Sequence, residues 1–161
     1  MKFLYTIILS VLLLSCANTN QSVVKSDDEL SSTITLLFDK YVANDFEISD
    51  YYADDVIARV NNQELNGYEN LIAGYKAHHE LLYDNISIDE LYVHTNYFSD
   101  GEVWSNSWFT WSAVGKTTGE EYTNRAHFDY KWENGKIVEL LAYYSEYADL
   151  KESAALQAAQ E

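Results

Sequence analysis

The sequence contains no proline, a single cysteine and few basic residues. One cysteine cannot form a disulfide within the chain, so no disulfide framework holds the fold together. Lysine and arginine number 10 against 26 aspartates and glutamates, which gives a formal net charge of −16. Nucleic acids and anionic membrane surfaces repel so acidic a chain. We therefore expect no nucleic-acid partner.

Spaced motifs for cofactors and nucleophiles are also missing. The sequence has no Cys/His cluster of metal-binding spacing, no nucleotide-binding glycine loop and no Gly-x-Ser-x-Gly elbow. His78 and His79 are adjacent, so on a helix they point about 100° apart and cannot bind one metal as histidines four residues apart do. We expect no metal and no other cofactor.

The N-terminus has the pattern of a secretion signal. Lys2 precedes an uncharged apolar run over residues 3–14, which closes on Ser15 and Cys16. A short basic start, an apolar stretch and a small residue before the cut are typical of cleaved signals. The run is too short for a transmembrane helix, which needs roughly 20 apolar residues.

The lone Cys16 stands where that run ends, which is the place of the acylated cysteine in a bacterial lipobox. The segment therefore resembles a lipoprotein signal. This resemblance implies that residues 1–15 are removed and that acylated Cys16 attaches the chain to a lipid bilayer. Ala17 follows in place of an inner-membrane retention aspartate, which favours the outer membrane, at its periplasmic face or at the cell surface. A plain signal with a chance cysteine is the alternative.

The rest of the chain is predicted to be one domain. Residues 16–27 are polar without hydrophobic periodicity and indicate a flexible tether. Ser26-Asp27-Asp28-Glu29 then allows two interpretations, an acidic export tag or a capping box at a helix start. An apolar periodic run follows at once, which favours the capping box. The domain spans 28–148, and a polar tail covers 149–161.

Hydrophobic periodicity predicts helices first and strands afterwards. Helical spacing of apolar residues covers 28–43, with a short helix at 46–52 and a third from 67 to about 82. A short strand at 56–60 interrupts them. From Ile86 onward the period is two, which predicts strands at 86–97, 102–114, 121–132 and 136–147. Helices followed by an antiparallel meander make an α+β domain.

Two segments carry a family resemblance. Residues 46–56 read FEISDYYADDV and residues 128–139 read FDYKWENGKIVE. Both are similar to phrases of nuclear transport factor 2-like proteins, especially the SnoaL-like branch, and with the element order the resemblance covers 28–148. It implies a cone-like roll, in which three N-terminal helices pack in a curved antiparallel or mixed β-sheet. It also implies a pocket at the wide end and a possible homodimer through the outer sheet face.

The same resemblance bears on chemistry. Ketosteroid isomerases on this scaffold use a tyrosine and two aspartates, and alignment on the two segments places Leu37, Val60 and Phe128 at those positions. Hydrocarbon can neither donate to an oxyanion nor accept a proton, so the isomerase mechanism cannot operate there. We therefore expect a non-catalytic binder of a small, mostly apolar molecule.

The aromatic content of 15% suits such a pocket. In the strand at 121–132, the alternation places one aromatic face toward the cone interior. The residues predicted to line the pocket are Leu37, Tyr41, Val60, Tyr75, His79, Trp108, Asn124, Phe128 and Tyr130. Two alternatives stay open: an enzyme of the cyclase, dehydratase or hydrolase type with Asp55 and His79 as catalytic candidates, or a structural interaction module of the envelope.

Other chemistry-bearing residues have mainly structural explanations. Arg125, His127 and Asp129 alternate on the outward face of their strand, which favours a charge ladder or a dimer surface over catalysis, because an outward row encloses no substrate. His79 shares an apolar stripe, which is typical of a core histidine. Trp104, Trp108 and Trp111 crowd one strand, and sheet packing, pocket lining and dimer burial each explain them.

Overall fold

The first helix of the domain begins where Asp28 caps it. The computed structural model describes residues 21–161, so the predicted signal peptide and Cys16 lie outside the described residues. Helix α2 (Glu29–Val42) starts because the Asp28 carboxylate accepts a hydrogen bond from the Ser31 amide at 2.9 Å. The predicted helix is confirmed, but the capping box of Ser26 and Glu29 was wrong. The cap is Asp28.

Seven strands form one curved mixed sheet, in the order β1-β4-β5-β6-β7-β2-β3. All pairs are antiparallel except β2 with β7. The bounds of the strands are β1 Val23–Lys25, β2 Tyr52–Val60, β3 Gln63–Asn66, β4 Tyr83–Tyr97, β5 Val103–Gly115, β6 Glu121–Glu133 and β7 Lys136–Tyr143. The predicted meander corresponds to β4 to β7.

The remaining helical elements are α3 (Tyr68–Ala77), a π-helical turn at His78–Leu82, and α4 (Tyr147–Ala158). The second predicted helix was wrong, since only a 3₁₀ turn at Ser49–Tyr51 occurs there. Strand β2 already begins at Tyr52 and runs on through the two aspartates. In the described part of the chain, no helix is long and apolar enough to cross a membrane.

Two short edge strands were not predicted. Residues Val23–Lys25, within the predicted tether, pair with the end of β4 as β1. At the other edge, Asn61 adopts a left-handed conformation, with φ 49°, and turns the chain back so that β3 pairs with β2. Asparagine tolerates that conformation better than most residues, so the predicted Asn61-Asn62 turn closes a hairpin.

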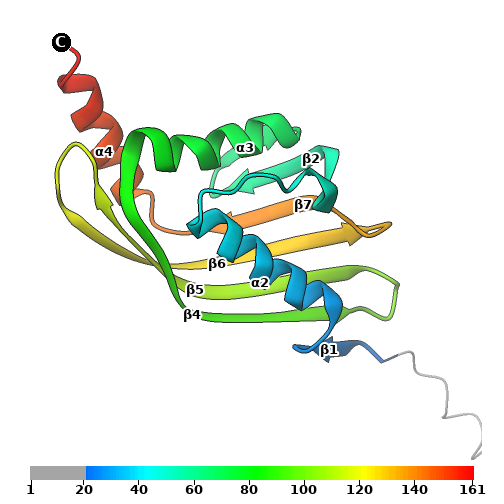
Figure 1. The fold of residues 1–161 in the computed structure, drawn as a ribbon. Helices are drawn as coiled ribbons and strands as arrows, with labels where there is room; N and C mark the ends of the chain where they lie inside the picture. Colours follow the sequence, from blue (N-terminus) through cyan, green and yellow to red (C-terminus); the bar gives the residue numbers. More distant parts are fainter. Residues whose placement is uncertain (1–20) are drawn as a thin grey trace, which may run out of the picture.

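Helices α2 and α3 cover the inner face of the curved sheet, whereas α4 lies at one end of it, beside the turn between β5 and β6 (Figure 1). The main core fills the space between α2 and the sheet, with Ile34, Val56 and Ile137 fully buried. A smaller cluster joins α4 to the sheet through Ala148, Tyr83 and Tyr122. The predicted α+β cone-like roll is confirmed.

Candidate functional site

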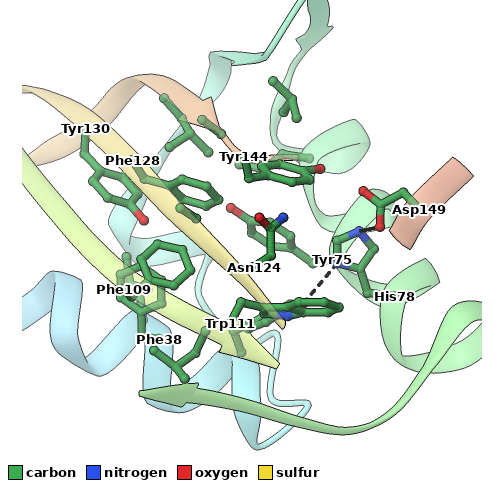
Figure 2. A pocket seen from close by; sticks show the side chains of 18 of the residues that line it. Phe38, Tyr75, His78, Phe109, Trp111, Asn124, Phe128, Tyr130, Tyr144 and Asp149 are labelled. Carbon is green, nitrogen blue, oxygen red and sulfur yellow. Dashed lines mark hydrogen bonds and ion pairs between the residues drawn. The ribbon is translucent and has the colours of Figure 1, made fainter. Parts of the chain in front are cut away.

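A cavity of about 100 Å³ lies between the helices and the inner face of the sheet. Its wall is mostly hydrocarbon and aromatic (Figure 2). Side chains alternate between the two faces of a strand, so every second residue of β6 faces this space. The residues that β6 contributes to the wall are Asn124, Ala126, Phe128 and Tyr130.

Most of the residues predicted to line a pocket do line this cavity. They are Leu37, Tyr41, Val60, Tyr75, Asn124, Phe128 and Tyr130. The three positions aligned with isomerase groups are among them, so hydrocarbon faces the cavity at each one. Wall residues that were not predicted include Phe38, Phe109 and Tyr144, whereas pocket lining was one of the explanations given for Trp111, which does line the cavity.

Two predicted wall residues lie elsewhere, and one catalytic candidate is exposed. His79 is not part of the wall, because its ring packs against Tyr41 and Phe46, with centroids 5.1 and 5.7 Å apart. The π-helical turn that starts at His78 shifts the register, so His78 faces the cavity instead. Trp108 lies on the outer face of β5 with 43% of its surface exposed. Asp55 is exposed on β2.

The histidine and the aspartate of the wall lie together at one end. Figure 2 shows His78 and Asp149 there, and Phe38, Phe109, Phe128 and Tyr130 at the opposite end. The Tyr41 hydroxyl and His78 Nδ1 form a hydrogen bond of 2.9 Å, in which the donor depends on the histidine tautomer. His78 Nε2 is 4.0 Å from Asp149 Oδ1, which is too far for a hydrogen bond.

Asp149 has its own hydrogen-bond partner, since the Tyr83 hydroxyl donates to Asp149 Oδ1 at 2.6 Å. Asp149 belongs to α4, in the segment predicted as a polar tail, and no local pattern in the sequence assigned it to the site. Its position depends on how α4 packs against the rest of the domain.

Burial determines the protonation of the cavity groups. Burial lowers the pKa of His78, and the nearby Asp149 carboxylate opposes that effect. The imidazole is therefore neutral at pH 7. Burial raises the pKa of Tyr41 and of Tyr75, so both phenols stay protonated. Beside Asp149, the wall thus presents one neutral imidazole and protonated phenols to whatever the cavity holds.

The outer face of the sheet carries a row of exposed aromatic side chains. Trp108 stacks on His94, with ring centroids 5.3 Å apart and an interplanar angle of 14°, and contacts His127 at 4.5 Å. His127 Nε2 lies 2.8 Å from Asp129 Oδ1. His127 and Asp129 therefore lie on the outer face of the sheet, as predicted, and Arg125 is exposed beside them.

The crowded tryptophans of β5 divide between the two faces. Trp111 lines the cavity, whereas Trp104 points outward, where Lys131 lies over its ring and its indole N–H donates to Glu102. Within residues 21–161, no group of three or more histidine, cysteine or acidic side chains is placed to hold a metal ion.

No protein-family model matches the sequence, and no curated protein matches it. Solved structures do match. A candidate polyketide cyclase from Silicibacter sp. TM1040 superposes with a TM-score of 0.64 and 18% identity, covering 76% of this chain and 93% of that chain. A candidate SnoaL-like polyketide cyclase from Jannaschia sp. CCS1 gives 0.54 and 13%, covering 75% and 88%. A candidate isomerase from Bacillus subtilis gives 0.59 and 11%, covering 77% and 91%.

The fold is SnoaL-like. Identities this low show the fold alone, because unrelated chemistries share one scaffold. What a SnoaL-like domain does depends on its own cavity. In this chain that cavity combines an apolar wall with the polar end formed by Tyr41, His78 and Asp149.

Proposed function

We propose that the cavity binds a small, mostly apolar molecule. The proposal rests on one observation: the wall is mostly hydrocarbon and aromatic, while its histidine and its aspartate lie together at a single end. Binding sites for small molecules commonly have this composition, in which a few polar groups orient a ligand that apolar contacts hold. The ligand therefore directs one hydroxyl or carbonyl group toward His78 and Asp149.

The size of the cavity limits that ligand. An engineered apolar protein cavity of about 150 Å³ binds benzene, and the volume here is about 100 Å³. The cavity has about two thirds of that volume, so one ring is about the largest compound that fits without movement of the wall. A polycyclic molecule requires the wall to move.

A cavity-filling variant tests the binding. Ala126 lies in the wall on β6, and its neighbour Arg125 is exposed on the other face of the strand. Ala126→Leu fills the cavity, whereas Arg125→Leu adds the same side chain outside it. In a fluorine NMR titration with fluorophenol, we expect saturable binding to the wild type and to Arg125→Leu, and none to Ala126→Leu. Equal binding to all three proteins would show that the probe binds elsewhere.

A second candidate function is proton transfer on the bound molecule. The polar end favours it, because neutral His78 can accept a proton and Asp149, 4.0 Å away, stabilises the resulting imidazolium. Tyr41 stays protonated and can donate to a carbonyl oxygen. This combination suits an enzyme of the cyclase or isomerase type, acting beside a carbonyl group.

The two adjacent histidines provide a matched test of catalysis. In deuterated water, proton transfer exchanges the hydrogens next to the carbonyl of a small ring ketone such as cyclohexanone. We expect His78→Gln to abolish exchange above buffer and His79→Gln to leave it unchanged, because His79 lies outside the wall. Exchange at the buffer rate with the wild type would refute catalysis on this ketone while leaving the binding proposal intact.

We also propose that Cys16 is acylated and holds the domain at the outer membrane. The support is the sequence pattern that ends at this cysteine. Cys16→Ser should move the protein from the membrane fraction to the soluble fraction and abolish labelling by a fatty-acid analogue. Membrane association that survives Cys16→Ser would contradict the anchor.

Pairing through the outer sheet face remains a proposal as well. Tyr92, Trp108 and Tyr143 are between 43% and 56% exposed there, and uncharged aromatic rings suit the association of two strongly acidic chains. Light scattering should report a dimer for the wild type and a monomer for Trp108→Glu. A wild type that is monomeric across the accessible concentrations would contradict this pairing.

A further inference from the structure

Glu152 is a completely buried acidic residue outside the cavity wall. It lies on α4, its exposed fraction is 0%, and its carboxylate points into the turn between β5 and β6. Carboxylates are almost never fully buried unless they are paired. This one has no basic partner among the contacts of the described chain, and hydrogen-bond donors surround it instead.

All of those donors come from the β5–β6 hairpin. The amides of Thr117 and Thr118 donate to Oε2 at 3.1 and 3.4 Å, and the Tyr122 hydroxyl donates to Oε1 at 2.8 Å. The Thr118 hydroxyl donates to Oε1 as well. Burial raises the pKa of Glu152, but these hydrogen bonds outweigh it and hold the pKa below its ordinary value. The side chain is therefore ionised at neutral pH.

Gly115 leaves the space that the Glu152 carboxylate occupies. Gly115 ends β5, and a Cβ atom there would lie 2.0 Å from Glu152 Oε1 and 2.3 Å from its carboxyl carbon. No side chain fits at that distance without moving Glu152. A glycine at the end of β5 and a buried glutamate on α4 therefore form one matched contact.

The same helix places Asp149 in the cavity wall. Asp149 lies three residues before Glu152, so both project from one side of α4. The other polar link between α4 and the hairpin is the ion pair of Lys151 with Glu120, whose side chains are 34% and 50% exposed. Exposed ion pairs contribute little, so the buried carboxylate is the stronger attachment.

We propose that Glu152 is a positioning residue, which latches α4 onto the β5–β6 turn and so holds Asp149 at the polar end of the cavity. Glu152 does not touch the cavity itself. Because α4 contributes Ala148 and Asp149 to the wall, release of α4 should change the rate at which a bound ligand dissociates. This consequence rests on the proposed function. The latch can be tested without any ligand.

Hydrogen exchange measures the latch directly. Hydrogen bonds to a charged group change an opening equilibrium constant by a factor of about 10 to 100. Glu152→Ala should therefore speed exchange of the α4 amides by about that factor, while β5 and β6 stay protected. Gly115→Ala should do the same, because it displaces the carboxylate without changing it. Lys151→Met, one residue away, should leave the α4 amides protected. Protection of α4 in both Glu152→Ala and Gly115→Ala would overturn the proposal.

A double-mutant cycle separates positioning from a general structural role. Asp149 raises the pKa of His78, so Asp149→Asn should lower that pKa in the wild type, as read from the imidazole NMR signals. In the Glu152→Ala or Gly115→Ala background, α4 keeps its contacts through Tyr83 and Ala148 but is held less firmly. The same substitution should therefore lower the pKa of His78 by less than in the wild type. Glu152→Gln, which keeps one acceptor oxygen, should restore part of the effect. Equal shifts in all backgrounds would overturn positioning.

These measurements also separate the latch from the proposed function. If fluorophenol fails to bind the wild type while α4 exchange and the His78 cycle behave as stated, the binding proposal fails and the latch stands. If the probe binds equally well with intact and displaced α4, with no change in its dissociation rate, the latch has no role in ligand exchange.

Discussion

Filling the cavity also has a predicted effect on stability. Ala126 is 8% exposed on β6, and its methyl group faces a space of about 100 Å³. Ala126→Leu adds three carbon atoms there. Each buried methylene contributes about 0.8 kcal/mol, so the free energy of unfolding should rise by up to about 2 kcal/mol where the new side chain fits. In a wall without free space, overpacking lowers stability by about 1–3 kcal/mol.

The sign of the change therefore decides whether the space exists in solution. Urea unfolding followed by tryptophan fluorescence gives the free energy for the wild type, Ala126→Leu and the outward control Arg125→Leu. We expect the control to stay within about 0.5 kcal/mol of the wild type. A loss of 1 kcal/mol or more in Ala126→Leu at an unchanged slope would refute the cavity, because it means that neighbouring side chains already occupy it.

Three further predictions concern single groups. Asp149→Asn should lower the pKa of His78, because burial already disfavours the imidazolium and the substitution removes the carboxylate that opposes it; an NMR titration that shows a rise would contradict the assignment. Thr95→Val should lower the free energy of unfolding by about 1–3 kcal/mol, since buried Thr95 bonds both Ser31 and Ser105 at 2.9 and 2.8 Å, and a neutral result in urea would count against that chain of hydroxyls. Asp28→Ala should cost about 1 kcal/mol at pH 7 as a lost helix cap. Burial raises the pKa of Asp28, but the hydrogen bonds to its carboxylate outweigh burial and lower the pKa. The stabilisation is therefore present above pH 3.8, the ordinary pKa, and is lost as the pH falls through the lowered pKa of the folded protein. A cost of Asp28→Ala that persists in full at pH 2 would contradict this.

The parts of the fold with strong periodicity could be predicted from the sequence. Helix α2 buries one stripe of apolar residues, and β4 to β7 alternate, so local spacing defines both. The alternation on β6 correctly placed Phe128 and Tyr130 inside and Asp129 outside. The edge strand β1 could not be found this way, because Val23 pairs with Tyr97, far along the chain, and three residues carry too little pattern.

The polar end of the cavity depends on packing that local spacing does not report. An α-helical continuation of α3 selects His79 as the inward histidine, but the π-helical turn brings His78 to the wall. Asp149 reaches the site because Glu152, on the same helix, fits the space at Gly115. A buried glutamate and a glycine 37 positions apart in the sequence give no local signal that they meet. The sequence therefore predicted an apolar pocket and, at its polar end, Tyr41, but it predicted neither His78 nor Asp149 there.

Native mass spectrometry of the protein purified from membranes is the sharpest test of whether the cavity holds a ligand. We expect the wild type to carry a small compound of about one ring, which is released on unfolding, present in Arg125→Leu and absent in Ala126→Leu. A wild type whose native mass equals its unfolded mass, and which also fails to take up fluorophenol when the probe is added in excess, would contradict a ligand-binding cavity.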